Sequence, residues 1–348
     1  MPGPPPAPRP RAVPPPRPPR PPRGVRQRTR SGRAGRDRPG RRVGSGPMAA
    51  AFPTTFRTVA TGLAFPEGPV VLADGSLVVT EIARGRLTRV HDDGRTEVYA
   101  EVGGGANGAA VAADGSVYVC NNGGRWPLDV PSTVGAATPP NGPGSIQRVA
   151  PDGTVTTALD AIGGRPLDAP NDAAFGPDGG LWFTDPVWAS GQLERTAGSI
   201  CYLGPDGSAR RAHTGLQFPN GIGVSDDGRF LYVAESMTGS IVSFRIEGPG
   251  VLGDPKPNGL IGRRSVPDGF CADSAGRLIV AGHQTPSLFV LDAADGRPIA
   301  VVDVGATGPT NCCFGGPDGR TLYVTSSDRG EILALDWPVP GMALHPRG

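Results

Sequence analysis

A pattern of apolar and polar positions about 15 residues long recurs six times along the 348-residue chain. Each copy begins with a polar residue that carries a side-chain oxygen, continues with a short apolar run, reaches a glycine eight positions later and ends in a second apolar run. Because glycine adopts positive φ at little cost, apolar runs joined through a turn that is usually Asp-Gly predict a β-hairpin. The six copies start at Glu67, Asn107, Asn171, Asn220, Asp268 and Asn311.

A second pattern follows each hairpin in step with the first. Apolar and polar residues alternate over 85–94, 144–153, 198–207, 239–248, 286–296 and 330–337, which is typical of β-strands. A fourth run follows most of these segments, at 95–102, 154–162, 208–216 and 297–304. In the fourth repeat this run is irregular, and we interpret 247–259 as an inert loop rich in Pro and Gly. Four strands in each of six repeats predict an all-β fold, a six-bladed β-propeller.

The two ends of the repeated region complement each other. The sixth repeat stops after its third strand, at Trp337, whereas residues 56–67 precede the first hairpin. Those residues match 209–220 of the fourth-strand pattern, including the shared TGL-x-FP sequence. We therefore expect the N-terminal strand to complete the last blade, which closes the ring and protects its edge strands.

Composition divides the chain near Met48. Residues 1–47 contain 13 Arg and one Asp, so they carry 13 − 1 = +12, and the chain total of +2 leaves 2 − 12 = −10 for residues 48–348. With almost no large apolar side chains, the first stretch cannot bury enough surface to offset its ordering entropy. We predict a disordered Pro/Arg-rich tail over 1–47 and a propeller domain over 48–348. Such a tail is either a solvated extension, which we favour, or an arm for nucleic acid or anionic surfaces.

The remaining composition bears on location and partners. The five Cys residues lie within apolar strand patterns, and their odd number is typical of buried reduced thiols in a cytoplasmic protein. No segment approaches the roughly 18 apolar residues of a membrane span. We expect neither a membrane nor a nucleic-acid partner, and a monomer or small homo-oligomer. A long Pro/Gly/Thr insertion in the second repeat, residues 122–143, is either a lid or specificity element or a plain surface loop.

The candidate chemistry lies at the first residue of each hairpin pattern. In a propeller the first strand of every blade lines the central tunnel, so the six first residues form a ring. The ring contains two carboxylates and four carboxamides, and no cationic or thiol side chain. Converging oxygen ligands with a net charge of about −2 suit a hard divalent cation, and Ca²⁺ is the best match. The alternative is that these Asn and Asp residues only cap turns at the strand starts.

Several longer phrases resemble the gluconolactonase / senescence marker protein / luciferin-regenerating enzyme family over residues 52–337. They are PEGPV, PNDAAFGPDGGLWFTDP, FPNGIGVSDDGRFLYVAE, VPDGFCAD and TNCCFGGPDGRTLYVT. The resemblance implies a lactonase that opens a small lactone with one divalent cation, Ca²⁺ or else Zn²⁺, Mg²⁺ or Mn²⁺. It places the metal ligands at Glu67, Asn171, Asn220 and Asp268, with Asp268 also the base or nucleophile. It places Asn107 and Asn122 at the substrate.

The sequence departs from the sugar-lactonase branch of that family at two places. Ala169-Pro170 replaces an Arg-Phe pair, and the segment 187–190 lacks an acidic residue, while Trp188 and Trp126 suggest a more apolar rim around the substrate. His283 follows a hairpin strand and either relays protons to a leaving alkoxide or is a plain loop residue.

The expected chemistry of the ring is compatible with more than one function. A phosphotriesterase-type hydrolase on the same site, or a non-catalytic interaction platform, are the alternatives to a lactonase. Asp172 and Asp185 flank the third hairpin, where we expect them to orient Asn171 or cap the turn.

Overall fold

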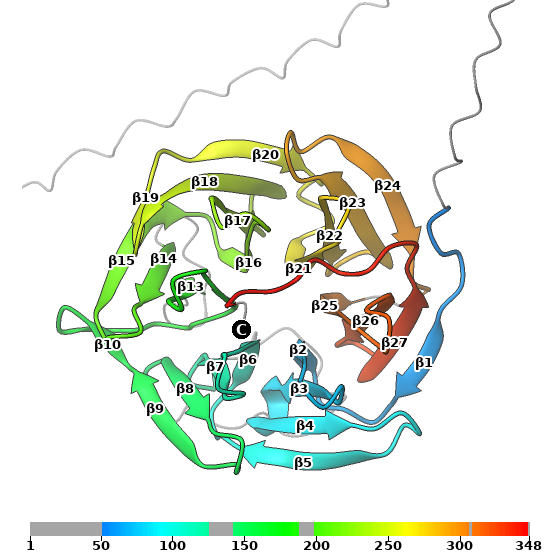
Figure 1. The fold of residues 1–348 in the computed structure, drawn as a ribbon, viewed down its shortest axis with the longest axis horizontal. Helices are drawn as coiled ribbons and strands as arrows, with labels where there is room; N and C mark the ends of the chain where they lie inside the picture. The colour runs from blue at the N-terminus through cyan, green and yellow to red at the C-terminus, as the bar shows by residue number, and fades with distance from the viewer. Residues whose placement is uncertain (1–50, 125–141, 188–197, 306–307, 347–348) are drawn as a thin grey trace, which may run out of the picture. The chain divides into compact units, whose positions relative to one another are not determined.

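The predicted six-bladed propeller is confirmed by a computed structural model of the chain, which describes residues 51–124, 142–187, 198–305 and 308–346. Within these residues, six antiparallel sheets surround one central axis (Figure 1). The predicted tail, Trp126 and Trp188 lie outside the described residues, as does most of the 122–143 insertion. Among the described residues, no helix is long and apolar enough to cross a membrane.

The first three blades follow one another along the chain. Blade 1 contains β2 (Pro66–Val71), β3 (Leu77–Glu81), the short helix η1 (Ile82–Arg84), β4 (Arg86–Val90) and β5 (Thr96–Glu101). Blade 2 contains β6 (Ala106–Val111), β7 (Val117–Asn121), β8 (Ser145–Val149) and β9 (Val155–Leu159). A hairpin of β10 (Ala161–Ile162) and β11 (Arg165–Pro166) leads to blade 3, which contains β12 (Ala173–Phe175), β13 (Leu181–Asp185), β14 (Gly198–Leu203) and β15 (Ala209–Leu216).

The last three blades complete the circle. Blade 4 contains β16 (Pro219–Val224), β17 (Phe230–Glu235), β18 (Ser240–Gly248), β19 (Val251–Leu252) and β20 (Lys256–Leu260). Blade 5 contains β21 (Pro267–Ala272), β22 (Arg277–Gly282), β23 (Ser287–Asp292) and β24 (Pro298–Asp303). Blade 6 contains β25 (Pro309–Gly315), β26 (Thr321–Ser326) and β27 (Glu331–Asp336), and its outer strand is β1 (Arg57–Ala60).

The ring closes as the sequence predicts. Strand β1 pairs antiparallel with β27, so the sheet of blade 6 has the order β1-β27-β26-β25 and joins the two ends of the repeated region (Figure 1). Ala60 and Leu63 are buried in the apolar cluster that blade 6 shares with blade 1. The N-terminal strand therefore contributes both backbone hydrogen bonds and core packing.

The inner hairpin of every blade turns at the glycine that the repeated pattern supplies. All six glycines have positive φ, between 69° and 83°, as the hairpin prediction requires. The preceding Asp supports the turn in most blades; Asp74 Oδ1, for example, accepts hydrogen bonds from the backbone N–H and the hydroxyl of Ser76. This local chemistry fixes the register of the two inner strands.

Six apolar clusters stabilise the ring, and each one lies between two neighbouring blades. In the cluster between blades 5 and 6, for instance, Ile279 and Val290 pack with Leu322 and Val324. No blade has a core of its own, so each sheet depends on the neighbours on both sides.

One sequence interpretation is wrong. Residues 247–259 were expected to be an inert loop, but they include β19 and most of β20, the outer strand of blade 4. Strand β18 is nine residues long and presents an open edge, which β20 pairs with in spite of Pro257. The need to cover that edge outweighs the weak strand signal of this segment.

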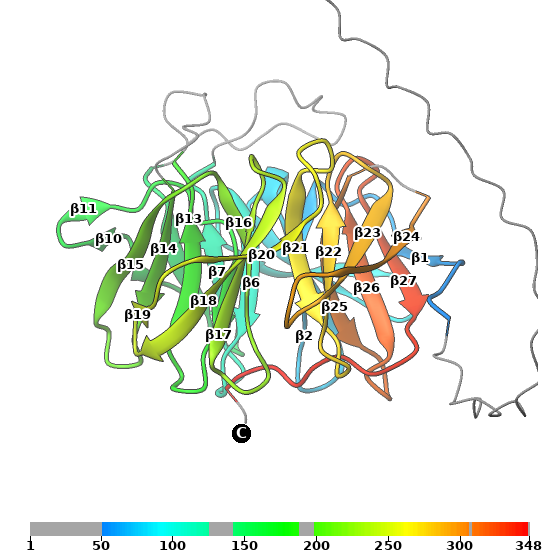
Figure 2. The ribbon, with the colours of Figure 1, turned by 90° about the horizontal axis from the view of Figure 1, so that it is seen from above.

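The two ends of the tunnel differ. The inner strands begin at one end, and the C-terminal segment crosses the other, where the strands finish (Figure 2). Met342 N donates to Ala272 O in blade 5, Ser274 N donates to Pro340 O, and His345 Nε2 contacts Ser225 O in blade 4. The end where the inner strands begin therefore lies opposite the C-terminal segment.

Truncation tests the closure of the ring. Removing residues 1–47 should leave the thermal unfolding of the protein unchanged, because the closing strand is retained. Removing residues 1–63 should lower the free energy of unfolding by at least about 3 kcal/mol, since it exposes the surfaces that Ala60 and Leu63 cover. Equal melting curves for the two truncated proteins would contradict the closure.

Candidate metal centre

The six ring residues all lie at the beginning of the inner strands and are buried. They are Glu67, Asn107, Asn171, Asn220, Asp268 and Asn311. Their exposed fractions are between 4% and 8%, except for 9% at Asp268. Five lie within inner strands, and Asn171 comes two residues before β12. Burial of six polar side chains at one level requires partners for each of them.

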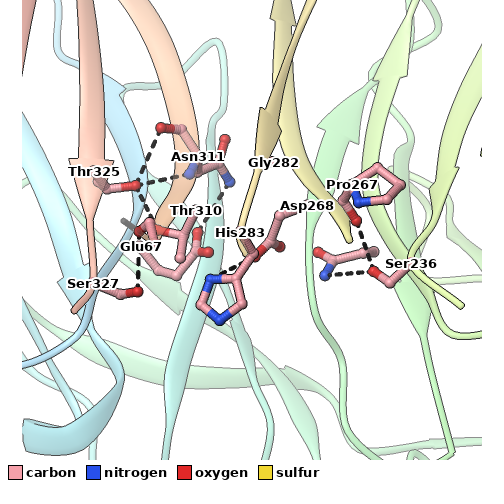
Figure 3. A network of polar contacts seen from close by, with 12 residues as sticks. Glu67, Ser236, Pro267, Asp268, Gly282, His283, Thr310, Asn311, Thr325 and Ser327 are labelled. Carbon is pink, nitrogen blue, oxygen red and sulfur yellow. Dashed lines mark hydrogen bonds and ion pairs between the residues drawn. The ribbon is translucent and has the colours of Figure 1, made fainter. Parts of the chain in front are cut away.

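Asn311 connects three blades through one amide group. Its Nδ2 atom donates to Glu67 Oε2 at 3.1 Å (Figure 3). The same Nδ2 atom donates to Asp172 Oδ2 at 3.2 Å, while the Oδ1 atom accepts the backbone N–H of Cys312. The backbone N–H of Asn311 donates in turn to Thr325 Oγ1. The amide therefore faces two carboxylates as a donor and is held in that orientation.

Asp172 reaches the tunnel because of the residue type at one position of the repeat. A glycine follows the ring residue in four repeats, at Gly68, Gly108, Gly221 and Gly269, where a Cβ would collide with the next inner strand or its side chains. In the third repeat this position is Asp172, which packs against Gly108 and is 6% exposed. The sequence suggested a supporting role for Asp172, and the structure brings its carboxylate into the centre.

Asp268 lies next to His283. Asp268 Oδ2 is 3.8 Å from Nδ1 of His283, and that nitrogen is buried without a hydrogen bond in the described part of the chain (Figure 3). Burial lowers the pKa of His283, which favours the neutral imidazole at neutral pH.

Asn220 is oriented by a serine that the sequence analysis did not single out. Its Nδ2 atom donates to Ser236 Oγ at 3.2 Å, and the Ser236 hydroxyl donates to Pro267 O at 2.7 Å (Figure 3). With Nδ2 directed to Ser236, the Oδ1 atom of Asn220 is left as an acceptor. Ser236 directly follows the second strand of blade 4, which is the only signal the sequence offers.

The three acidic side chains of the tunnel, Glu67, Asp172 and Asp268, come from alternate blades, and all three have raised pKa values. Burial is the largest cause for each: it raises the pKa of Glu67 to about 7, that of Asp172 to about 8 with help from the charge of Glu67, and that of Asp268 well above its usual range. The charges of Glu67 and Asp172 add to the effect on Asp268. Negative charge at this level is thus strongly disfavoured unless protons or a cation compensate it.

These donors fit a hard divalent cation. All are carboxylate or amide oxygens, which Ca²⁺ and similar cations prefer. Among the described residues, no three His, Cys, Asp or Glu side chains lie close enough to one another to hold a metal ion by themselves. A cation here would therefore depend on the Asn oxygens as well as on the carboxylates.

The other predicted site residues lie at different places. Asn107 is buried in the ring, and its backbone carbonyl accepts the hydroxyl of Thr80. Asn122 is buried, its Oδ1 atom accepts the backbone N–H of Gly124, and the same atom lies against Gly105, two residues before Asn107.

A cavity of about 230 Å³ lies at the entrance of blade 3. Leu167, Asp168, Asp185 and Arg211 contribute to its walls. Arg211 Nη2 lies 3.9 Å from Asp185 Oδ2, and the Arg211 side chain also donates to the backbone carbonyls of Ile162 and Pro166. The cavity adjoins the segment that leads into Asn171.

The chain belongs to the SMP-30/gluconolactonase/LRE-like family, whose model matches residues 65–328. It is 25% identical to a gluconolactonase of Zymomonas mobilis over 307 residues, which cover 79% of each chain. It is 31% identical over 186 residues to the diisopropyl-fluorophosphatase of Loligo vulgaris, with 50% of this chain and 59% of that protein covered. The solved structure of a gluconolactonase from Xanthomonas campestris is 25% identical and superposes with a TM-score of 0.68, covering 84% of this chain and 93% of the other.

The charge repulsion in the tunnel gives a stability prediction. Because the folded pKa of Asp172 lies above its unfolded value, the folded state binds more protons, and this carboxyl lowers stability as the pH rises from about 4 through about 8. In EDTA at about pH 8.5, Asp172→Asn should raise the free energy of unfolding by about 1 kcal/mol or more, and at about pH 4 the gain should vanish. Denaturant unfolding of both proteins at the two pH values measures this. A variant destabilised equally at both would contradict the repulsion.

Proposed function

We propose that the protein is a metal-dependent hydrolase that opens small lactones, with one divalent cation at the ring. The observation that carries the proposal is a set of three buried carboxylates at the end of the tunnel where the inner strands begin, two of which accept hydrogen bonds from the Asn311 amide. Membership in a family that includes a gluconolactonase 25% identical over most of the chain supports the reaction type. An interaction platform would have no use for mutually repelling buried carboxylates, since apolar side chains could fill its tunnel.

The ligands we assign are Glu67, Asn171, Asn220 and Asp268, and Ca²⁺ is the preferred ion. Two carboxylates and two neutral amides leave a divalent cation with a formal balance of about 2 − 2 = 0, so it remains electrophilic. When bound, such a cation polarises the lactone carbonyl and stabilises the negative charge that develops on its oxygen. Asn311 keeps Glu67 turned toward Asp172 by hydrogen bonding to both carboxylates.

Asp268 is the catalytic carboxylate in this proposal. Its carboxylate either accepts a proton from the attacking water or attacks the carbonyl carbon itself. A bound cation lowers the pKa of Asp268, and burial together with the neighbouring acids raises it, so the two effects oppose each other. His283 Nδ1, 3.8 Å from Asp268 Oδ2, is placed to hold a proton and pass it to the leaving alkoxide.

The substrate reaches these groups from the end of the tunnel where the inner strands begin. Asn107 belongs to the ring and is assigned to the substrate rather than to the cation. Asn122, which the sequence also assigned to the substrate, directly follows the second strand of blade 2, at the end where the inner strands begin. Trp188, assigned to the substrate as well, lies outside the described residues.

Activity assays with defined metal content test the proposal. The purified protein should open lactones, lose the activity in EDTA, and regain it best with Ca²⁺ when Ca²⁺, Mg²⁺, Mn²⁺ and Zn²⁺ are added back separately. Asp268→Asn should lower kcat by at least about 100-fold while Ca²⁺ still raises the melting temperature. Full activity in EDTA, or near-normal turnover by the variant, would refute the assignment.

A second function, hydrolysis of phosphotriester-type substrates, is favoured by the 31% identity to diisopropyl-fluorophosphatase. Both reactions develop negative charge on an oxygen, so the same ring suits both. The assay should therefore include a fluorophosphate ester beside the lactones. A kcat/KM for that ester above every lactone value would replace the first proposal with the second.

A further inference from the structure

A buried acceptor at the end of the second strand holds the segment that leads into the ring residue in four blades. Glu81 Oε2 accepts the backbone N–H of Ala64 at 2.6 Å, and Glu235 Oε1 accepts that of Gln217 at 2.7 Å. In both cases the donor lies three residues before the ring residue. We call Glu81, Asp185 and Glu235 the latch residues, because each is acidic, buried and bonded to such a segment.

The other two examples differ in residue type or in the number of bonds. Asp185 Oδ1 accepts the N–H groups of Asp168 at 3.0 Å and Ala169 at 2.9 Å, which lie just before Asn171. Asn121 Oδ1 accepts Gly105 N at 3.0 Å, before Asn107. Three latch residues thus serve assigned cation ligands, while Asn121 serves a ring residue outside that set.

Two of the segments that the latches hold, in blades 1 and 4, and the corresponding segment of blade 5 have an unfavourable backbone conformation. Among the described residues, the non-glycine positions with positive φ are Phe65 at 56°, Phe218 at 56° and Val266 at 50°. Each lies two residues before an assigned ligand, namely Glu67, Asn220 and Asp268. Left-handed backbone costs bulky side chains about 1–3 kcal/mol and persists only where the surroundings enforce it. Directly before Phe65 and Phe218, the Ala64 and Gln217 bonds to Glu81 and Glu235 add to backbone bonds from Ile82 N to Phe65 O and from Ser236 N to Phe218 O.

In blade 3, no described non-glycine residue of the segment before Asn171 has a positive φ. The segment borders the 230 Å³ cavity at Leu167 and Asp168. The two bonds to Asp185 hold this segment together with backbone bonds from Gly144 N to Asp168 O and from Asn171 N to Thr184 O.

Blade 5 lacks the latch. Its equivalent position is Gly282, and the segment before Asp268 has the backbone bonds that blades 1 and 4 have in addition to a latch, here from His283 N to Val266 O at 3.1 Å and from Gln284 N to Ser265 O at 3.2 Å. Without a latch side chain at this place, the imidazole of His283 is the group that faces Asp268.

We propose that Glu81, Asp185 and Glu235 are positioning residues that set the geometry of the cation site by fixing the backbone before Glu67, Asn171 and Asn220. The inference rests on the proposed cation site. Loss of a latch should let the strained or unsupported segment relax and move its ligand, without removing any ligand atom. Supporting groups of this kind typically change metal affinity by about 10–100-fold.

Glu235 offers the cleanest variant, because its bonds are fewer than those of Glu81, which also binds Arg84, Arg86 and Thr88. Glu235→Ala removes the acceptor, and Glu235→Gln keeps an oxygen in the same place without the charge. Asn121→Ala is the matched control, since it removes the same kind of bond before Asn107. All are made in the full chain, and their unfolding in EDTA shows whether each protein is folded.

Two measurements decide the inference. In metal-free protein, hydrogen exchange of the backbone amides at 217–221 should accelerate in Glu235→Ala and return toward normal in Glu235→Gln. Calorimetric titration with Ca²⁺ should show at least about 10-fold weaker binding in Glu235→Ala, recovery to within about 3-fold in Glu235→Gln, and less than about 2-fold change in Asn121→Ala.

The outcomes separate the latch from the proposed function. Unchanged exchange at 217–221, or faster exchange with unchanged Ca²⁺ affinity, would overturn the positioning role. If Ca²⁺ does not bind the unaltered protein, the proposed cation site fails, and the hydrogen exchange still decides whether Glu235 fixes the backbone before Asn220. Equal weakening by Asn121→Ala would reduce the latch to a general contribution to stability and would also overturn the inference.

Discussion

Mutual repulsion between buried carboxylates is the constraint on which the site depends. Glu67, Asp172 and Asp268 come from blades 1, 3 and 5, and burial raises the pKa of all three. A protein under selection for stability alone would replace such groups with apolar side chains. A hard divalent cation, which the surrounding amide oxygens suit, would compensate the charge of these carboxylates.

The propeller provides the rigidity that this arrangement needs. Each apolar cluster joins two blades, so a shift of one inner strand disturbs two cores. The closing strand β1 makes the circle continuous, and Asn311 links blades 1, 3 and 6 across the tunnel. The backbone is strained two residues before three of the assigned ligands, at Phe65, Phe218 and Val266. In two of these three blades a buried carboxylate accepts a hydrogen bond from the strained segment. These segments are therefore tightly constrained by their surroundings.

Local patterning made much of this fold predictable. The Asp-Gly hairpins, their even spacing and the unpaired N-terminal strand follow from residue type and period, and they define the blades, the closure and the level of the ring. Strand β20 was missed because its pairing is a demand of the exposed edge of β18, which no local signal reports.

The arrangement within the ring was less predictable, since it depends on distances between blades. Sequence placed Asp172 beside Asn171, but only the packing against Gly108 and the bond from Asn311 show that its carboxylate belongs to the centre. Asp185 was expected to orient Asn171 or cap the turn, but Glu81 and Glu235 escaped notice for the same reason as Asp172, because the donor and the acceptor are 17 or 18 residues apart.

The central claim, a single cation held by the ring, is tested most directly by crystallography with an anomalous scatterer. Crystals of the protein grown with Mn²⁺ in place of Ca²⁺ should show one strong anomalous peak per chain at the end of the tunnel where the inner strands begin. The account predicts oxygen atoms of Glu67, Asn171, Asn220 and Asp268 within about 2.0–2.6 Å of that peak. A tunnel with no peak, or a peak bound elsewhere on the chain, would contradict it.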